Sequence, residues 1–551
     1  MTPGNELLFL ALGGSGEIGM NVNLYGTAGK WLMVDLGMTF GEHDYPGIDL
    51  VLPDLEFIEK RRKDLVGLVL THGHEDHIGA IPYLANDLGV PLYATPFTAG
   101  LIAHKLEEEG LTGKVKVRLI HPGDVLDLGP FKVTPIPLAH SIPEANGLLI
   151  ETAHGKVFHT GDWKLDPNPV VGNPTSPEAL KAIGDQGILA MVCDSTNVFT
   201  DKVSGSESEL FDGLMDAVEE APGRVLITTF ASNAARLHTI GEVAEESGRR
   251  IAVAGRSIER YLKVAKATGY LRDFPETIRY DEAMRLPKKE LLVLATGGQG
   301  EARAALGRIA SGQHEIRFTD GDTVIFSSRQ IPGNENAVGR VMNQLAQLGV
   351  RTVTERQAHV HVSGHPGRPE LLQMYGWIRP QLLVPVHGEP RHLLEQARLG
   401  LSSGIPKALV QKNGDVIRLA PGDPRKIGSE RVGRLVLDGD VILPADGATM
   451  NERRRLAHQG VVAVSLVLRK DGSLAAAPVI RPLGLPVEAD RDDFLADAAD
   501  TAAKAVAGAR STSDSGRDEE KLRESVRLAV RRCAAVWTGK KPSVEVLVTR
   551  L

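Results

Sequence analysis

The sequence predicts an α/β protein that is divided into several domains, and three observations support this. A chain of 551 residues is too long for one ordinary hydrophobic core, so about three domains are expected. Hydrophobic residues make up 42% and charged residues 24%, which is typical of globular proteins. Apolar runs closed by turns give way, from about residue 206, to alternating helix and strand candidates. The first part is therefore expected to be mixed β and α, and the second a separate α/β domain.

Strands are expected where a short run of apolar or β-branched residues ends in a turn. In the first part, such runs lie at residues 7–12, 30–35, 115–120, 131–136 and 147–151. In the second part, strand candidates lie at residues 225–229, 250–254, 291–295 and 323–327, and amphipathic helix candidates at 208–220 and 234–247. This alternation is typical of βαβ units around a parallel sheet.

Histidines are frequent near residue 70 and become frequent again at residues 359–387. If the two groups meet, the α/β domain is an insertion into the first domain. We therefore expect a discontinuous first domain at 1–205 and 361–425, an insertion at 206–360, a linker at 426–450 and a C-terminal domain at 451–551.

The C-terminal domain is expected to combine strands with helices. A strand candidate at residues 461–467 precedes an alanine-rich helix candidate at 494–509, and another strand candidate lies at 544–548. The tract from Ser511 to Gly516 has the composition of a loop.

Bulk properties exclude several classes of protein. No apolar run approaches the length of a membrane span, and the first residues carry no signal-peptide pattern. The two cysteines, Cys193 and Cys533, cannot cross-link a protein of this size, so a reducing cytoplasm is expected. The net charge of −7 argues against a generally basic nucleic-acid binder, but not against a local basic channel or bound cations.

The most informative stretch runs from Thr71 to Ala80, directly after an apolar strand candidate. It contains the pattern H-x-H-x-D-H, formed by His72, His74, Asp76 and His77. Imidazole and carboxylate are ligands that zinc prefers. In an extended segment His72 and His74 point to the same side, whereas Asp76 and His77 lie where a helix is expected to begin and can face a second ion. The pattern favours a two-metal site over histidines satisfied by local hydrogen bonds.

Two metal ions need more ligands than this stretch supplies. His140, Asp162 and His387 each lie near the end of an apolar segment beside small residues, where a strand end can present a ligand. We assign one ion to three histidines and the other to three further residues, with one bridging carboxylate. The sets are His72, His74 and His140 for the first ion, Asp76, His77 and His387 for the second, and Asp162 as the bridge. Zinc is the expected metal, with manganese or magnesium as alternatives.

Several motifs support a family resemblance. They are Gly13–Asn21, Thr71–Ala80, Leu138–Glu144, His159–Lys164, Asp194–Asn197 (motif A), Ser363–His365 (motif B) and Pro385–Glu389 (motif C). The chain resembles the metallo-β-lactamase superfamily and, within it, the β-CASP nucleases, most closely the bacterial ribonuclease J family. The resemblance covers about residues 8–422. It implies an αββα sandwich with an inserted α/β β-CASP domain and a small C-terminal α+β domain.

The resemblance also implies a function and roles for further residues. Two cations would activate a water that attacks the RNA phosphodiester, with Asp76, Asp194 and His365 as the catalytic residues. His365 would protonate the leaving O3′, and Asp194 would orient the site. The implied substrate-binding residues are Ser232, Asn233, His361, Ser363, Gly364 and His365. The family resemblance implies 5′-to-3′ exonuclease activity on single-stranded RNA that carries a 5′-monophosphate, together with possible endonuclease activity. It also implies a role in RNA maturation and decay, and assembly into a homodimer or homotetramer.

Two positions depart from the family pattern. Gly298 stands where the family has serine, and Pro366 follows motif B where alanine is common. Neither position is a predicted metal ligand, but Pro366 lies beside His365 and bears on the substrate pocket.

Other functions are consistent with parts of the pattern. A small-molecule thioesterase or lactonase of the same superfamily would keep the H-x-H-x-D-H pattern without Asp194, motif B or a long insertion. A DNA-directed β-CASP nuclease would keep all of them, and no motif identifies a contact to the 2′-hydroxyl that separates RNA from DNA. A non-catalytic scaffold would lose ligands, whereas every expected ligand is present here.

Overall fold

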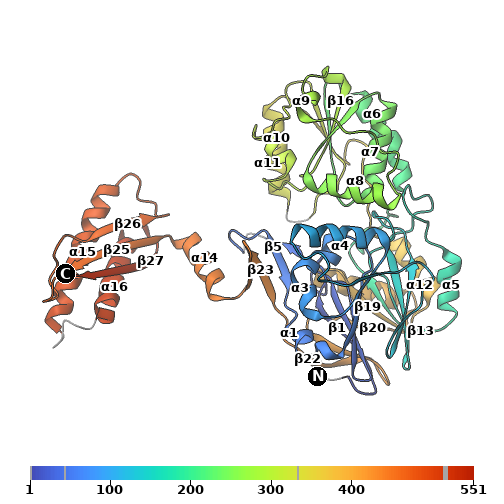
Figure 1. Ribbon diagram of the computed structural model, residues 1–551, viewed down its shortest axis with the longest axis horizontal. Coiled ribbons are helices and arrows are strands. Elements are labelled where there is room, and N and C mark those ends of the chain that lie inside the picture. Colours follow the sequence, from blue (N-terminus) through green and yellow to red (C-terminus); the bar gives the residue numbers. More distant parts are fainter. Residues whose placement is uncertain (1–2, 42–44, 332–333, 513–518) are drawn as a thin grey trace. The chain divides into compact units, whose positions relative to one another are not determined.

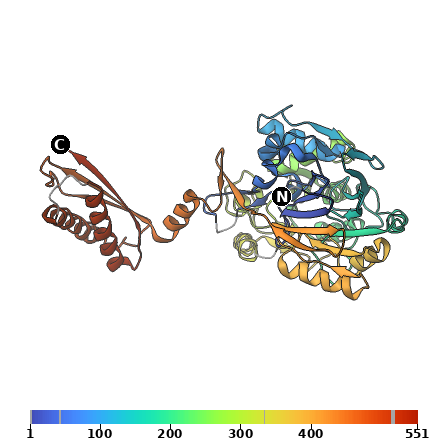
Figure 2. The same ribbon diagram turned by 90° about the horizontal axis from the view of Figure 1, so that it is seen from below.

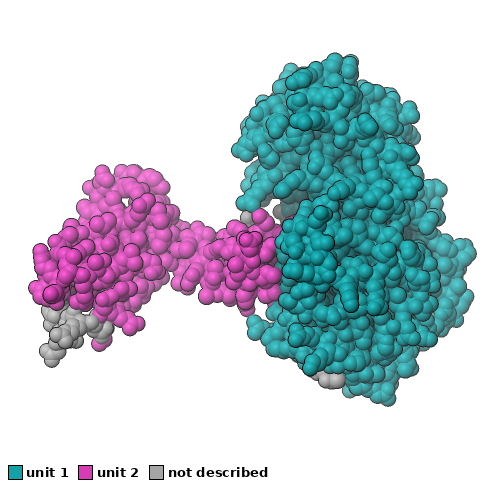
Figure 3. Space-filling model, viewed as in Figure 1, with its two compact units in different colours: residues 1–39, 52–432 teal, residues 40–51, 433–551 magenta. Residues whose placement is uncertain are grey.

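The computed structural model describes residues 3–41, 45–331, 334–512 and 519–551. These residues form two compact units, which Figure 3 shows in different colours. The first unit comprises residues 1–39 and 52–432, and the second comprises residues 40–51 and 433–551. Among the described residues, no helix combines the length and the apolar character that crossing a membrane requires.

Two sheets form the centre of the first unit. The strands of one sheet lie in the order β22 (Arg425–Ser429), β21 (Asp415–Ala420), β1 (Leu7–Gly13), β2 (Val22–Thr27), β3 (Lys30–Val34), β6 (Leu65–Val69), β7 (Leu92–Ala94) and β8 (Val117–Leu119). Those of the other lie in the order β20 (Lys407–Ala408), β19 (Leu382–Val386), β13 (Ile188–Asp194), β12 (Gly155–His159), β11 (Asn146–Thr152), β10 (Phe131–Pro137) and β9 (Leu126–Leu128).

Apolar side chains from both sheets share one core. Phe9 and Val34 of the first sheet pack with Phe131, Val157 and Val384 of the second. The other face of the second sheet packs against helices, which are α5 (Pro177–Gly184), α12 (Arg368–Ile378) and α13 (Pro390–Ser402). Two helices, α3 (Ile81–Leu88) and α4 (Pro96–Glu108), follow strands of the first sheet (Figure 1). The predicted αββα sandwich is confirmed.

The residues that separate the two parts of the sandwich in the sequence form a parallel sheet of their own. Its strands have the order β15 (Arg250–Ala254), β16 (Leu291–Ala295), β14 (Val225–Thr228), β17 (Thr323–Phe326) and β18 (Arg351–Val353). The helices connecting or preceding these strands include α6 (Leu210–Glu219), α7 (Ala234–Glu246), α8 (Arg256–Thr268), α10 (Ala305–Ala310) and α11 (Glu335–Gln347) (Figure 1). This is the predicted inserted α/β domain.

The second unit ends in an α+β arrangement. Its sheet has the strand order β26 (Val479–Leu483), β25 (Val461–Leu468) and β27 (Ser543–Arg550). Alternate residues such as Val464 and Val546 pack against α15 (Arg491–Thr512) and α16 (Glu519–Thr538), and both helices lie on one face of the sheet (Figures 1 and 2). The predicted loop at 511–516 begins later than expected, because α15 includes Ser511 and Thr512; residues 513–516 lie outside the described residues.

The segment 426–450, expected to be a linker, carries regular structure. β22 extends to Ser429, and β23 (Arg434–Asp438) pairs with β24 (Val441–Pro444) as an antiparallel hairpin. The signal was present in the sequence, because apolar runs at residues 435–437 and 441–443 lie on either side of an Asp-Gly turn at residues 438–439, which is typical of a hairpin. The domain boundaries given above stay a prediction.

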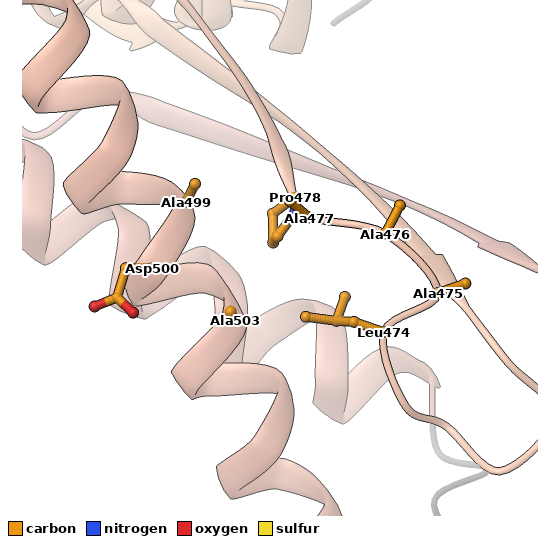
Figure 4. A pocket seen from close by; sticks show the side chains of 8 residues that line it. All are labelled: Leu474, Ala475, Ala476, Ala477, Pro478, Ala499, Asp500 and Ala503. Carbon is orange, nitrogen blue, oxygen red and sulfur yellow. The ribbon is translucent and has the colours of Figure 1, made fainter.

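A hollow of about 330 Å³ lies in the C-terminal domain, between the loop that precedes β26 and helix α15 (Figure 4). Its lining consists of Leu474, Ala475, Ala476, Ala477, Pro478, Ala499, Asp500 and Ala503. The only ionisable side chain of this lining, Asp500, pairs with Lys504 at 2.6 Å. The lining is therefore suited to packing rather than to catalysis.

Candidate metal centre and active site

The candidate ligands lie where strands and helices of the sandwich begin or end. His72 and His74 follow β6, and Asp76 and His77 lie in the short helix α2 (Glu75–Ile78), as the sequence predicts. In the second sheet, β12, β13 and β19 are parallel neighbours, so the residues at or just after their carboxyl ends meet at one edge. Asp162, Asp194 and His387 reach the site in this way, and His140 follows β10.

Potential ligand atoms gather in three overlapping groups, within each of which all of them lie within 4.8 Å of one another. The groups are His72, His74, His140 and Asp162; Asp76, His77, Asp162 and His387; and Asp162, Asp194, His365 and His387. The first two match the two predicted ligand sets with their shared aspartate. The individual assignments stay a prediction.

Three imidazole nitrogens converge in the first group. The Nδ1 atom of His74 lies 3.1 Å from the Nε2 atom of His72 and 3.1 Å from the Nε2 atom of His140. Burial lowers the pKa of His74 to about 4, and burial also holds the pKa values of His72 and His140 well below their ordinary value. All three imidazoles are therefore neutral near pH 7, which is the form that binds metals. The donor set fits a zinc ion.

Two carboxylates and two imidazoles make up the second group. Asp162 Oδ2 lies 3.2 Å from His77 Nε2, and Asp76 Oδ2 lies 3.0 Å from His387 Nε2. Burial alone would raise the pKa of Asp162, but the imidazoles of His387 and His77 outweigh burial and hold it well below its ordinary value. Burial alone would lower the pKa values of these two histidines, yet Asp162 raises both. A divalent cation would replace the protons that they carry.

Asp162 lies at the centre of all three groups. Its Oδ2 atom is 3.8 Å from His72 Nε2, 3.9 Å from His140 Nε2 and 3.9 Å from His365 Nδ1. Its Oδ1 atom is 3.3 Å from His387 Nδ1. This position between the two predicted ligand sets is the one expected of a bridging carboxylate.

Asp35, which sequence reasoning did not single out, orients part of the site from the end of β3. Its carboxylate accepts hydrogen bonds from the backbone N–H of Thr71 at 2.8 Å, from the Thr71 hydroxyl at 2.9 Å and from His77 Nδ1 at 2.8 Å. A carboxylate on one ring nitrogen fixes the tautomer and leaves the other nitrogen to bind a metal. The available signal was an aspartate directly after an apolar strand.

Motifs A and B meet beside the candidate metal ligands. His365 Nδ1 lies 2.8 Å from Asp194 Oδ2, and Thr196 donates hydrogen bonds to Asp194 Oδ1 from its backbone at 2.8 Å and its hydroxyl at 2.7 Å. Burial alone would lower the pKa of His365, but Asp194 and Asp162 outweigh it and raise this pKa. His365 therefore keeps a proton more readily than an ordinary histidine.

Gly364 joins motif B to the first group of ligands. Its carbonyl accepts a hydrogen bond from His140 Nδ1 at 2.6 Å. A Cβ atom at Gly364 would lie 2.9 Å from His140 Cε1, so a larger residue requires one of the two segments to move. Asn197 holds the same loop by donating to the Ser363 hydroxyl at 2.6 Å and to the His365 carbonyl at 3.0 Å.

The other predicted substrate-binding residues lie at the inserted domain. Asn233 caps α7, since its side-chain oxygen accepts a hydrogen bond from the Arg236 N–H at 2.8 Å; Ser232 directly precedes it. The first turn of α7 reaches the His140 loop, where the Ala235 N–H donates to the Ser141 carbonyl at 3.5 Å. His361 lies apart from the ligand groups and against Arg236, with its Nδ1 atom 3.5 Å from the guanidinium. Burial and this charge lower the pKa of His361.

Family profiles match most of the chain. The β-lactamase superfamily domain matches residues 46–177, and the ribonuclease J β-CASP domain matches residues 222–345. The Zn-dependent metallo-hydrolase RNA specificity domain matches residues 351–409, and the ribonuclease J C-terminal domain matches residues 448–551.

Curated relatives are similar over long alignments. A protein of Sinorhizobium meliloti named Ribonuclease J is 42% identical over 558 residues, covering 100% of this chain and 98% of the relative. A protein of the same name from Corynebacterium glutamicum is 40% identical, and the match covers 88% of this chain and 68% of the relative. Another from Mycolicibacterium smegmatis is 39% identical, and the match covers 87% of this chain and 86% of the relative. A solved structure of a protein of unknown function from Enterococcus faecalis V583 is also similar, with a TM-score of 0.53 and 17% sequence identity. The match covers 75% of this chain and 100% of that protein, and at this identity it shows a likeness of fold alone.

Proposed function

This chain belongs to the ribonuclease J family, a group of metal-dependent nucleases that act on RNA, and from this premise we propose a 5′-to-3′ exoribonuclease. It prefers RNA with a 5′-monophosphate, retains some endonuclease activity and takes part in RNA maturation and decay. The observation that carries the proposal is the contact between Gly364 and His140, at 2.6 Å. A 5′-phosphate bound by motif B would lie next to the metal ligands, and so close to the bond that is cut.

We assign the metal ligands as the sequence predicts. Two divalent cations, with zinc as the expected metal and manganese or magnesium as alternatives, would supply a hydroxide nucleophile near neutral pH and neutralise charge on the phosphoryl oxygens. His72, His74 and His140 would hold one ion, and Asp76, His77 and His387 would hold the other, with Asp162 as the ligand that both sets share. Asp35 supports this set by orienting His77.

His365 is the proposed general acid. Asp194 accepts a hydrogen bond from its Nδ1 atom, so the proton on Nε2 is the one available to the leaving O3′. Asp76 is proposed to contribute to catalysis from its position beside His387 Nε2. Asp194 is proposed to contribute by accepting the hydrogen bond that orients His365. The substrate pocket comprises Ser232, Asn233, His361, Ser363, Gly364 and His365, of which His361 acts from beside Arg236 rather than from the metal centre.

One experiment tests this function directly. The metal-loaded protein is incubated with 5′-monophosphorylated, 5′-triphosphorylated and circular forms of one RNA, and with the matched DNA. We expect mononucleotide release from the monophosphorylated RNA to be faster than from the triphosphorylated RNA by at least about tenfold, a difference of about 1.4 kcal/mol. A His77→Ala variant, which removes a predicted metal ligand, serves as the inactive control.

Each alternative function gives a different result in that experiment. Equal cleavage of DNA would indicate a DNA-directed nuclease, and rapid cutting of circular RNA would indicate a mainly endonucleolytic enzyme. If a thioester or lactone is hydrolysed and no RNA is cleaved, the ribonuclease proposal fails.

We also propose that the protein is a homodimer or homotetramer in the cytoplasm. Both described cysteines are buried and unpaired, which is consistent with a reducing compartment. The face of the C-terminal sheet opposite α15 and α16 exposes Val479 (65%) and Leu547 (61%), an apolar surface suited to contact with a second copy. On the same face, Arg481 and Glu545 flank Ala463, so a twofold axis there would pair their opposite charges.

Replacing Leu547 with glutamate is expected to weaken this self-association. A buried carboxylate at the centre of an apolar contact loses its hydration without gaining a partner, so the subunits separate. Light scattering after size-exclusion chromatography should give a lower mass than for the wild type. Val536, which is 86% exposed on α16, offers the matched control, since Val536→Glu should leave the mass unchanged.

A further inference from the structure

Arg236 is an arginine of α7 whose side chain is fully buried at 0% exposure. Its guanidinium forms a two-point contact with Glu207, at 3.0 Å from Nε and 3.2 Å from Nη2. It also donates to the carbonyl and hydroxyl of Ser327, both at 2.7 Å, and to the carbonyls of Val360 at 3.3 Å and Val362 at 3.4 Å. One side chain therefore links three separate segments of the chain.

Two of these segments connect the inserted domain with the sandwich. The outgoing segment contains Ser204 and Glu207, and the returning segment contains Val362 and Ser363. They lie side by side, since the Ser363 N–H donates to the Ser204 carbonyl at 3.4 Å. Arg236 contacts the outgoing segment through Glu207 and the returning segment through two carbonyls, so it fixes their spacing.

The charge of Arg236 belongs to a buried series of ionic groups. Glu207 pairs with Arg236, and the Glu207 N–H donates to Asp166 at 3.1 Å. Asp166 in turn pairs with Lys164 at 3.0 Å, and Lys164 lies two residues after Asp162 in the sequence. Burying charges is costly, and an apolar pair of similar size often stabilises a fold equally well. A role in holding geometry is a reason for these charges to be present.

We propose that Arg236 is a positioning residue for RNA cleavage, because its guanidinium holds residues 360–362 and thereby sets the place of Ser363 and His365. The carbonyl of Val362 belongs to the same peptide group as the N–H of Ser363, so the hydrogen bond to Val362 acts directly on motif B. The inference rests on the proposed function of motif B in phosphate binding and proton transfer. It adds a residue that touches neither RNA nor metal.

Two substrates separate positioning from general stability. Under the proposed function, cleavage of 5′-monophosphorylated RNA needs motif B to bind the 5′-phosphate and to protonate the leaving group. The substrate bis(4-nitrophenyl) phosphate needs neither, because it has no 5′-phosphate and its leaving group departs without a proton. In the double variant Glu207→Met/Arg236→Met, kcat for RNA is expected to fall about 100-fold, the effect of a displacement of about 1 Å. Hydrolysis of the nitrophenyl diester and the bound metal content should stay near the wild-type values.

The double variant removes both charges, so no unpaired carboxylate is left in the core. Arg236→Lys keeps the positive charge but cannot form the two-point contact, and it should recover only part of the RNA cleavage. Arg249 gives the matched control, since it is also buried and donates to the carbonyls of Gly223 and Leu291 at the opposite end of the sheet. Arg249→Met is therefore expected to lower the melting temperature and to leave the ratio of the two activities unchanged.

Three results would overturn the inference. Equal loss of both activities would mean that Arg236 acts only through stability, and unchanged RNA cleavage would mean that motif B does not depend on it. Loss of bound metal would place the effect at the ligands instead. Wild-type protein that hydrolyses the diester but no RNA would contradict the proposed function as well, and this is seen before any variant is made.

Discussion

Replacing His365 with alanine is expected to slow RNA cleavage by roughly 10³-fold, while hydrolysis of bis(4-nitrophenyl) phosphate stays within about threefold of the wild type. The leaving O3′ of RNA needs a proton, and the raised pKa of His365 keeps that proton available beside Asp194. A nitrophenolate departs without protonation, so its release does not depend on this histidine. Steady-state kinetics with both substrates measure the difference.

Metal analysis of the same variant provides the control. His365→Ala should retain the metal content of the wild type, because His365 is outside both proposed ligand sets. Loss of metal would make His365 a ligand, which its grouping with Asp162, Asp194 and His387 allows geometrically. Equal slowing of both substrates would also argue against a role in protonating the leaving group.

The pH profile of the wild-type enzyme should reflect the same residue. With His365 as the proposed general acid, RNA cleavage requires its protonated form, so the rate is expected to decline as the pH rises through the pKa of His365. Because Asp194 raises this pKa, the Asp194→Asn variant should begin its decline at a lower pH. An alkaline limb at the same pH in both proteins would rule out His365 as the group that titrates.

Replacing Asp162 with asparagine is expected to remove bound metal and to slow the hydrolysis of both substrates by about 10³-fold or more, a loss of several kcal/mol of transition-state stabilisation. The carboxylate lies within 3.9 Å of a nitrogen of each of five histidines. An amide supplies neither the negative charge nor the second anionic oxygen that a bridge between two cations requires. Metal content by mass spectrometry and rates with both substrates test this.

Asp415 provides a comparison for that variant. It is a buried aspartate on β21, where it pairs with Lys426 at 2.6 Å. Asp415→Asn should keep its metal and both activities, whereas full metal content in Asp162→Asn would refute the bridging role.

Elements dominated by one physical signal were predictable from the sequence. Apolar runs such as residues 291–295 form buried strands because such runs favour burial, and the histidine pattern at residues 72–77 has few uses besides metal binding. The hairpin β23–β24 was missed although its signal is present, since apolar runs at residues 435–437 and 441–443 flank an Asp-Gly turn.

The supporting residues of the site were harder to predict. An arginine in a helix is usually read as solvent-exposed, so Arg236 carried no signal for its buried contacts. Asp35 lies at a strand end where aspartate commonly serves a turn. Both acquire their roles from segments far away in the sequence, such as Val362 and His77, which local patterns do not reveal.

The hydrogen bond between His140 and Gly364 spans 224 positions of the sequence, with the whole inserted domain between them. During synthesis, the ribosome therefore completes residues 72–162 long before His365 and His387 emerge. A chain that stalls within the insertion lacks the proposed acid and one proposed ligand of the second ion. On these proposed assignments, we expect an incomplete chain to be inactive until the returning segment closes the site.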